Sequence, residues 1–288
     1  MTTPDVPRGT LFVVATPIGN LGDLTRRAGE ILARVSHVAA EDTRRTRQLL
    51  THLGITGKTL HRVDAHASAA DLDRVVDTLA AGHDVALATD AGTPAVSDPG
   101  SALVARAVLR GHTVVPIPGA SAVLAALVAS GLSGDRGFRF FGFLPREGPE
   151  RSRDLARIAE TPEPVVLFES PHRTRETLEE IAFVSPLRAC AVARELTKLH
   201  EEIVRGTVSD LGRDTREWRG EVVIVLGPHD TEARETTIDD AQLDTRIDAG
   251  LAEGLHAKTL AERLAAFSGR PKREVYERVV KRKAERSR

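Results

Sequence analysis

Short apolar runs alternate with amphipathic helices through the first 117 residues, and this alternation constrains the fold more than any other feature. Uninterrupted runs of this length are typical of strands that are buried on both faces of a parallel sheet. The expected strands cover residues 11–15, 37–40, 58–63, 85–88 and 113–117, of which 58–63 (KTLHRV) is the most polar. Helices that connect parallel strands give right-handed crossovers. We therefore expect an N-terminal α/β domain over residues 1–117.

The loop after the fourth run is the centre of this domain. Residues 87–100 read LATDAGTPAVSDPG, between a predicted strand and a predicted helix at 102–109. Open α/β sheets bind ligands at this position, beyond the carboxyl ends of the strands. Prolines stiffen the backbone, and glycines allow a ligand to approach it closely. We interpret the stretch as a ligand-binding loop; the alternative is a rigid connector with capping aspartates.

A second α/β domain is predicted over residues 118–228. Its expected strands cover residues 165–168, 188–193, 203–207 and 221–226, and its expected helices cover 172–183 and 209–214. It opens with a small-residue loop at 118–122, which leads into a helix whose N-terminus suits a polar or anionic ligand. We expect Asp23 to cap the first helix of the chain and residues 145–149 to form a polar loop.

Residues 229–288 form a third region with a change of charge inside it. Residues 228–255 contain eight Asp and Glu against two Arg, whereas residues 256–288 contain eleven Lys and Arg against four Glu. Apolar residues at helical spacing predict two helices that are separated by a break at 269–271. We expect an acidic, flexible linker followed by a basic helical appendage, with the acidic part able to shield the basic part.

Composition and missing motifs exclude several classes of protein. The chain is 41% hydrophobic and has a net charge of −1, so its overall charge indicates no polyanionic partner. It lacks a phosphate-binding G-x-x-x-x-G-K-[ST] loop, a G-x-G-x-x-G loop and an H-E-x-x-H zinc motif. Gly119 to Val123 is only a partial nucleophile elbow, which disfavours a serine hydrolase. The single cysteine, Cys190, excludes an internal disulfide and is expected in the core.

No targeting or membrane signal is visible in the sequence. The first residues lack the basic-then-apolar order of a signal peptide. No apolar run reaches the length that spans a bilayer. We therefore expect a cytoplasmic location and no membrane partner.

Six motifs occur in order along the chain and carry a family resemblance. They are residues 11–24 (LFVVATPIGNLGDL), 41–44 (EDTR), 90–100 (DAGTPAVSDPG), 116–122 (PIPGASA), 168–173 (FESPHR) and 193–202 (ARELTKLHEE). Together they resemble the bacterial small-subunit (16S) ribosomal RNA cytidine 2′-O-methyltransferases. These enzymes belong to the tetrapyrrole-methylase-like superfamily of S-adenosylmethionine (SAM) methyltransferases.

The resemblance implies a fold, a cofactor and a set of cofactor-binding residues. It implies two α/β domains with the SAM cleft between them, a small helical C-terminal appendage and a homodimer. The implied cofactor residues are Pro17, Asp90, Gly92, Thr93, Pro94, Ser121, Ala122, Phe168, Glu221, Val222 and Val223. Related tetrapyrrole methylases have Gly-Asp-Pro where this chain has Gly92-Thr93-Pro94, so Asp90 or Asp98 is the acid expected near the ligand.

Methylation of a ribose 2′-hydroxyl requires alignment of donor and acceptor and is helped by a proton acceptor. It requires no metal, and we expect none. Candidate acceptors are Asp98, Glu169, His172 and Glu195. Each has a structural alternative: Asp98 could be one of the capping aspartates of its loop, Glu169 could pair with Arg173, His172 could cap the following helix, and Glu195 could pair with Lys198 or Arg194.

Basic residues in three places are candidates for contacts with RNA phosphates. They are Arg44, Arg45 and Arg47 in the first domain, Arg194 and Lys198 after the second-domain strand, and Lys272, Arg273, Lys281 and Arg282 in the tail. The alternative is that they form solvated basic faces. The predicted function is methylation of small-subunit ribosomal RNA; a small-molecule tetrapyrrole methylase and a non-catalytic ribosome-assembly factor are the two alternatives.

Overall fold

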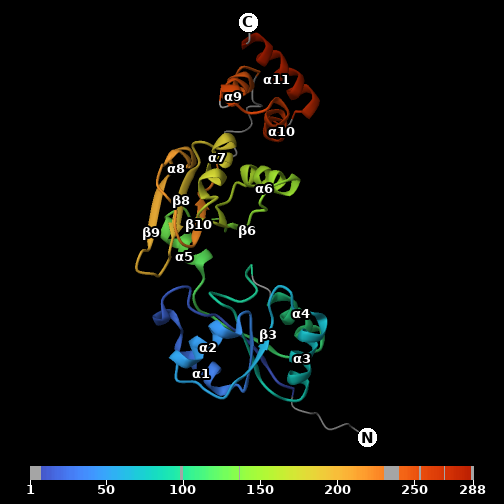
Figure 1. Cartoon of the computed structure of the whole chain (residues 1–288), viewed down its shortest axis with the longest axis vertical. Helices are drawn as coiled ribbons and strands as arrows, with labels where there is room; N and C mark the ends of the chain where they lie inside the picture. Colours follow the sequence, from blue (N-terminus) through green and yellow to red (C-terminus); the bar gives the residue numbers. More distant parts are fainter. Residues whose placement is uncertain are drawn as a thin grey trace. The chain divides into compact units, whose positions relative to one another are not determined.

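The computed structural model describes residues 8–97, 100–135, 137–229, 240–252, 254–268 and 270–286 (Figure 1). The chain forms two compact units. The first comprises Met1–Ala126 with Glu195–Glu202, and the second comprises Leu127–Arg194 with Ile203–Arg288. The division falls inside helix α5 (Ala122–Ser130), nine residues beyond the boundary expected at 117. No helix of the described ranges is long and apolar enough to cross a membrane.

The first unit contains a five-stranded parallel sheet. Its strands are β1 (Leu11–Val14), β2 (His37–Ala40), β3 (Thr59–Arg62), β4 (Val85–Ala88) and β5 (Val114–Ile117). Their order is β3-β2-β4-β1-β5. Along β4, Val85 and Leu87 pack into the core on one face, whereas Ala86 and Ala88 pack into the core on the other. Burial on both faces explains why the central strand β4 is a continuous apolar run, whereas the edge strand β3 is polar and only partly buried.

Side-chain caps set where the helices of the first unit begin. The helices are the 3₁₀ turn η1 (Leu21–Asp23), α1 (Arg26–Arg34), α2 (Thr43–His52), α3 (Ala69–Ala80), α4 (Ser101–Leu109) and α5. Asp42 caps α2, and Ser68 forms a capping box with Asp71 at α3. The prediction that Asp23 caps the first helix is wrong, because the chain first forms η1 and Thr25 then caps α1.

The second unit contains a mixed five-stranded sheet. Its strands are β6 (Arg139–Phe143), β7 (Val165–Glu169), β8 (Ala189–Arg194), β9 (Glu202–Thr207) and β10 (Val222–Leu226), in the order β6-β7-β10-β8-β9. Strand β10 lies antiparallel to β7 and β8, whereas β6 lies parallel to β7. Cys190 of β8 is buried as expected, and this burial raises the pKa of its thiol to about 12.

Helices α6 (Pro149–Glu160), α7 (Thr174–Val184) and α8 (Val208–Arg213) accompany this sheet. The sequence analysis assigned no helix to α6 and ended a polar loop at Pro149. Proline is favourable at the first helical position, so Pro149 instead begins α6. Arg151 anchors the helix, because its buried guanidinium donates to Glu180 and to the carbonyl of Pro145.

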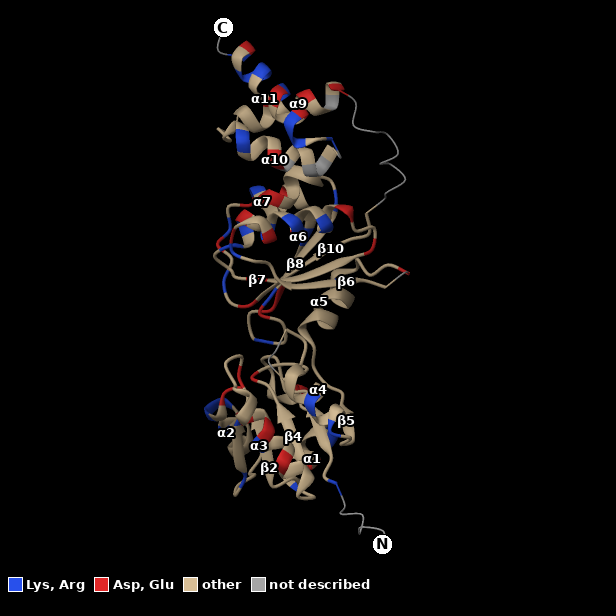
Figure 2. Ribbon diagram, turned by 90° about the vertical axis from the view of Figure 1, so that its right-hand side faces the viewer, with Lys and Arg blue, Asp and Glu red and all other residues tan. Residues whose placement is uncertain are grey.

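Three helices at the end of the chain form what we call the C-terminal helix module. They are α9 (Asp240–Ala252), α10 (Ala257–Ser268) and α11 (Lys272–Arg286). The expectation of a linker up to residue 255 is wrong for residues 240–252. They form a helix because Leu243 and Ile247 are buried against α10 and α11, and Phe183 of α7 packs against the same cluster. Figure 2 shows that acidic and basic residues occur together on this module.

The two α/β sheets and the C-terminal helices confirm the predicted fold class.

Candidate cofactor and catalytic site

The loops after β1 and β4 are joined at the carboxyl edge of the first sheet. The amide of Thr16 donates to the carbonyl of Gly92 at 2.9 Å, and the amide of Gly92 donates back at 3.1 Å. The hydroxyl of Thr93 donates to the carbonyl of Ala120 at 3.1 Å, which ties the same loop to the segment after β5. Residues predicted for cofactor binding on three separate segments therefore lie together at one edge.

The backbone of the loop after β4 is unusual. Gly92 has φ 81°, and the non-glycine residues Ala95 and Ser97 have φ 68° and 60°. A Cβ atom on Gly92 would lie 3.3 Å from Cγ2 of Ile18, so a side chain is disfavoured both by conformation and by space. Left-handed backbone in non-glycine residues is concentrated at ligand-binding and catalytic sites. Asp98, the predicted proton acceptor in this loop, lies outside the described residues.

The start of α5 completes this edge of the first unit. Ser121 precedes the helix, and its hydroxyl accepts a 3.4 Å hydrogen bond from the amide of Leu124. Ala122 is the first residue of α5. Amides in the first turn of a helix have no partner within the helix, so this terminus can bind the anionic part of a ligand.

Three carboxylates follow three adjacent strands at the same edge. Glu41 follows β2, Asp64 follows β3 and Asp90 follows β4. Asp90 accepts a 3.1 Å hydrogen bond from the amide of Asp42 and pairs with Arg45 at 3.4 Å. Asp64 pairs with Arg62 of β3. In the described part of the chain, no group of three His, Cys, Asp or Glu residues is arranged to hold a metal ion.

The carboxyl group of Glu41 has a raised pKa. Its half-buried position raises the pKa of its carboxyl group, and the negative charges of Asp90 and Asp64 raise it further. A hydrogen bond from the backbone of Asp90 and the charge of Arg45 oppose this shift. The sequence analysis did not select Glu41 as a candidate. The sequence feature that could have indicated Glu41 as a site residue is its position directly after an apolar strand and before Asp42.

Glu195, a predicted proton acceptor, lies in the segment that returns to the first unit. Its side chain pairs with Nζ of Lys198 at 2.8 Å, so the alternative interpretation of pairing is confirmed. Glu195 and Thr197 have φ 49° and 66°. The stem of Lys198 lies directly against Gly19, which leaves no room for a side chain there. This segment therefore belongs to the first unit through packing of Lys198 on the loop after β1.

Glu169, another predicted proton acceptor, accepts hydrogen bonds through both carboxylate oxygens within the second unit. Its side chain has no exposed surface and pairs with Arg173, whose Nε donates to Oε1 at 2.9 Å. The hydroxyl of Thr177 donates to Oε2 at 2.7 Å, and the amide of Ser170 donates to Oε1 at 2.7 Å. The alternative of a structural pair with Arg173 is confirmed. His172 is exposed and does not cap α7, since Arg173 holds the capping position without a side-chain bond.

The predicted cofactor residues of the second unit occupy two adjacent strands. Phe168 of β7 pairs in register with Val223 of β10, and Val222 pairs with Glu169. The Phe168 ring contacts the rings of Phe140 and Phe143, with centroids 5.0 and 5.3 Å apart. Glu221 directly precedes β10 and is exposed. Neither strand β6 nor its contact with Phe168 was predicted from the sequence.

The arginines of α2 differ in how strongly they are paired. Arg44 binds Asp42 through its side chain and its amide, and these hydrogen bonds lower the pKa of Asp42 to about 2. Arg45 pairs with Asp90. Arg47 is exposed and forms no ion pair with any residue that the structure describes. Arg194 ends β8 and is half-buried.

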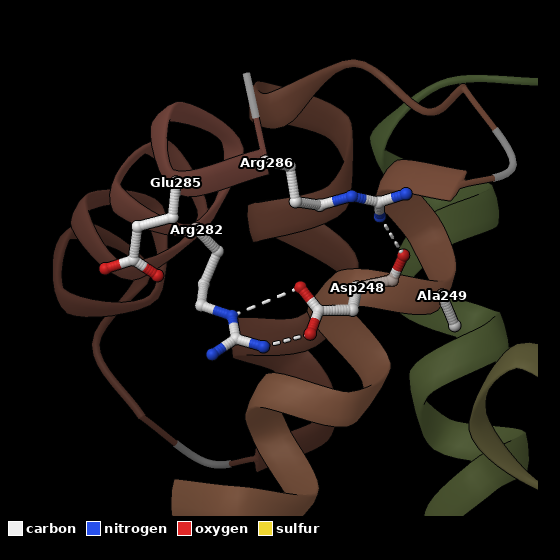
Figure 3. Close-up of a pocket in the computed structure, with 5 residues that line it drawn as sticks. All are labelled: Asp248, Ala249, Arg282, Glu285 and Arg286. Atoms are coloured by element: carbon white, nitrogen blue, oxygen red, sulfur yellow. Dashed lines mark hydrogen bonds and ion pairs between the residues drawn. The ribbon is translucent and has the colours of Figure 1, made fainter. Parts of the chain in front are cut away.

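Most basic residues predicted to bind RNA in the C-terminal helix module are also paired. Lys272 pairs with Glu262, Arg273 with Glu277 at 3.0 Å, and Arg282 with both Asp244 and Asp248. Figure 3 shows Arg282 and Arg286 converging on Asp248 beside a small pocket. Lys281 is exposed and has no ion pair within the described ranges.

Comparison with known proteins gives the class of this fold and site. The family model for Tetrapyrrole (Corrin/Porphyrin) Methylases matches residues 10–212. Uroporphyrin-III C-methyl transferase from Thermus thermophilus, solved with S-adenyl homocysteine, has a TM-score of 0.56 and 21% identity over 76% of this chain and 97% of that chain. This second likeness concerns the fold alone. The match to the family model shows that the chain belongs to the tetrapyrrole methylases.

Two relatives define the group more closely. A "Ribosomal RNA small subunit methyltransferase I" of Xylella fastidiosa (strain Temecula1) is 42% identical over 282 residues, which cover 96% of this chain and 99% of that protein. Its namesake in Neisseria meningitidis serogroup A is 43% identical over 273 residues, 93% of this chain and 92% of that protein. The chain therefore belongs to the ribosomal RNA small subunit methyltransferase I family, and the resemblance stated from the motifs is confirmed.

Proposed function

We propose that this protein transfers a methyl group from SAM to small-subunit ribosomal RNA, with the 2′-hydroxyl of a cytidine ribose as the acceptor. The observation that carries the proposal is the agreement of two findings. Relatives named for small-subunit ribosomal RNA match nearly the whole chain, and hydrogen bonds join residues of three motifs, at Thr16, Gly92 with Thr93, and Ala120, at the carboxyl edge of the first sheet. We further propose that the protein acts as a homodimer in the cytoplasm.

The residues at this edge fit the amino-acid part and the hydroxyls of SAM. SAM supplies an electrophilic methyl group on a positively charged sulfur. Asp90 offers a partly exposed carboxylate to a cationic or hydroxyl group, and the first turn of α5 offers amides to a carboxylate. Gly92 keeps the loop free of a side chain, so a ligand can lie against its backbone. Contributions of Phe168, Glu221, Val222 and Val223 to adenosine binding remain part of the proposal.

Basic side chains that lack an acidic partner are the strongest candidates to hold RNA phosphates. Arg47 on α2 and Lys281 on α11 meet this description among the described residues. Arg44, Arg45, Arg194, Lys198, Lys272, Arg273 and Arg282 would have to exchange a protein partner for a phosphate, which reduces their net contribution to binding.

Calorimetry with SAM, together with methylation of unmodified small ribosomal subunits, tests this function. Gly92→Arg should weaken SAM binding by roughly tenfold or more, about 1.4 kcal/mol, because the side chain fills the edge where the ligand lies. Gly54→Arg is the matched control. Gly54 also has a positive φ of 69°, but an added side chain there would meet open space.

Each alternative has its own outcome in this test. Equal SAM affinity in a folded Gly92→Arg variant would contradict the cofactor site. SAM binding without methylation of the subunits would contradict the proposed substrate and favour a small-molecule methylase or a binding factor.

A further inference from the structure

The described residues leave one acidic side chain at the candidate site without a cationic partner. Glu169 and Glu195 each hold an ion pair, and Asp90 is engaged by Arg45 and by the amide of Asp42. Glu41 is half-buried at the carboxyl edge of β2 and forms no ion pair within the described part of the chain. It lies next to the loop that carries Gly92, because β2 and β4 are neighbours in the sheet.

We propose that Glu41 is the proton acceptor that activates the hydroxyl to be methylated. This inference rests on the proposed function, since it assigns a residue to that reaction. The hydroxyl oxygen forms a bond to the methyl carbon while the carbon–sulfur bond breaks, and the electron pair of that bond remains on sulfur. The hydroxyl proton passes to the Glu41 carboxylate and is later released to water. The positive charge on sulfur and the negative charge on Glu41 disappear together, so the step leaves no net charge behind.

The surroundings of Glu41 suit this role. A general base works best when its pKa lies near the working pH, and an ordinary glutamate is too acidic for that. Burial and the charges of Asp90 and Asp64 raise the pKa of Glu41, while Arg45 and the Asp90 amide limit the rise. Arg62 pairs with Asp64, so the positive charge of Arg62 offsets part of the influence of the Asp64 carboxylate on Glu41. The raised pKa makes the Glu41 carboxylate more basic than an exposed glutamate.

Glu41→Gln tests the proposal directly. The substitution keeps the shape and removes the proton acceptor, so kcat at saturating SAM and subunits should fall by roughly 10²–10⁴. SAM affinity should stay within about twofold of wild type, since a lost acceptor affects the chemical step rather than donor binding. Glu41→Asp should recover part of the lost rate. Glu30→Gln is the matched control, because Glu30 lies on α1 in an exposed pair with Arg26.

The pH dependence of kcat gives a readout that a structural role would not change. The acid limb of this profile reports the protonation of the base in the bound complex. Asp90→Asn removes a negative charge and should move this limb to lower pH, whereas Arg45→Gln removes a positive charge and should move it to higher pH. Each displacement should be up to about one pH unit.

The outcomes separate this inference from the proposed function. Wild-type protein that binds SAM but methylates no subunits would overturn the proposed function, whatever Glu41 does. Active wild type with an equally active Glu41→Gln variant would overturn the assignment of Glu41 alone. Acid limbs that stay in place in both charge variants would also overturn it.

Discussion

Glu41 and Glu169 lie at equivalent places in two different sheets, but their surroundings differ and suit them to different roles. Each stands at the carboxyl end of a strand, β2 in the first unit and β7 in the second. Glu169 is buried, and both its oxygens accept hydrogen bonds from Arg173, Thr177 and the amide of Ser170. Glu41 is half-buried and keeps a raised pKa. A carboxylate whose lone pairs are all occupied stabilises the fold, whereas one with a free lone pair can accept a proton.

The basic residues of the C-terminal helix module show a similar contrast, between arginines that are paired and a lysine that is exposed. Arg278 pairs with Asp240 and Asp244, and Arg282 pairs with Asp244 and Asp248, which lie four residues apart on α9. The neighbouring Lys281 lies on another face of α11 and is exposed. One face of the helix therefore holds the module together, and the other leaves a cation available to a ligand.

The largest expected effect is on stability at Glu169. Glu169→Ala leaves the Arg173 guanidinium without its buried partner, and breaking a buried pair costs about 3–5 kcal/mol. Glu41→Ala should cost no more than about 1 kcal/mol, because no ion pair is lost. Urea unfolding of both variants measures the difference. Equal losses of unfolding free energy in the two variants would contradict the different roles of Glu169 and Glu41.

Acid should open the C-terminal helix module. Hydrogen bonds from Arg270 and Arg278 lower the pKa of Asp240, and a hydrogen bond from Arg278 lowers the pKa of Asp244, below the ordinary aspartate value of 3.8. A lowered folded-state pKa means that the stabilisation is complete above 3.8 and is lost as pH falls below it. Hydrogen exchange of α9 amides between pH 7 and 3 should show faster opening at the acid end.

Asp244→Asn supplies the control for this pH effect. The variant should open more readily at neutral pH and should lose part of the acid dependence, since the titrating group is gone. The change should be smaller than that at Glu169, because partly exposed pairs contribute less than buried ones. An opening equilibrium of the wild-type module that does not change with pH, after correction for the intrinsic pH dependence of amide exchange, would contradict the role of the ion pairs.

The smallest effect is expected on RNA binding. Lys281→Ala should reduce the slope of log affinity against log salt concentration by about 0.7–0.9, the value for one phosphate contact, and leave stability unchanged. Lys272→Ala is the matched control, since Lys272 already pairs with Glu262. If both variants changed the slope equally, the pairing seen in the module would not decide which cations bind RNA.

The sequence alone was sufficient for the parts of the fold that depend on near neighbours. All five strands of the first sheet were predicted, and the helix at α4 was predicted to within one residue of its start. Periodicity, caps and glycines at helix ends act over a few residues, so they can be found in the chain itself. The loop with Asp90 and Gly92 was likewise recognisable from its composition and its position after a strand.

Only the tertiary structure decided which residues are engaged in packing and ion pairs and which remain available to a ligand. In the strand β6 (Arg139–Phe143), Phe140 contacts Phe168, and residues 240–252 form a helix because Leu243 and Ile247 pack against α10 and α11. Glu169 and Arg282 form ion pairs, whereas Glu41 and Lys281 form none within the described part of the chain. The physical reason is that burial and ion pairing depend on groups far apart in the chain, whose meeting no local pattern encodes.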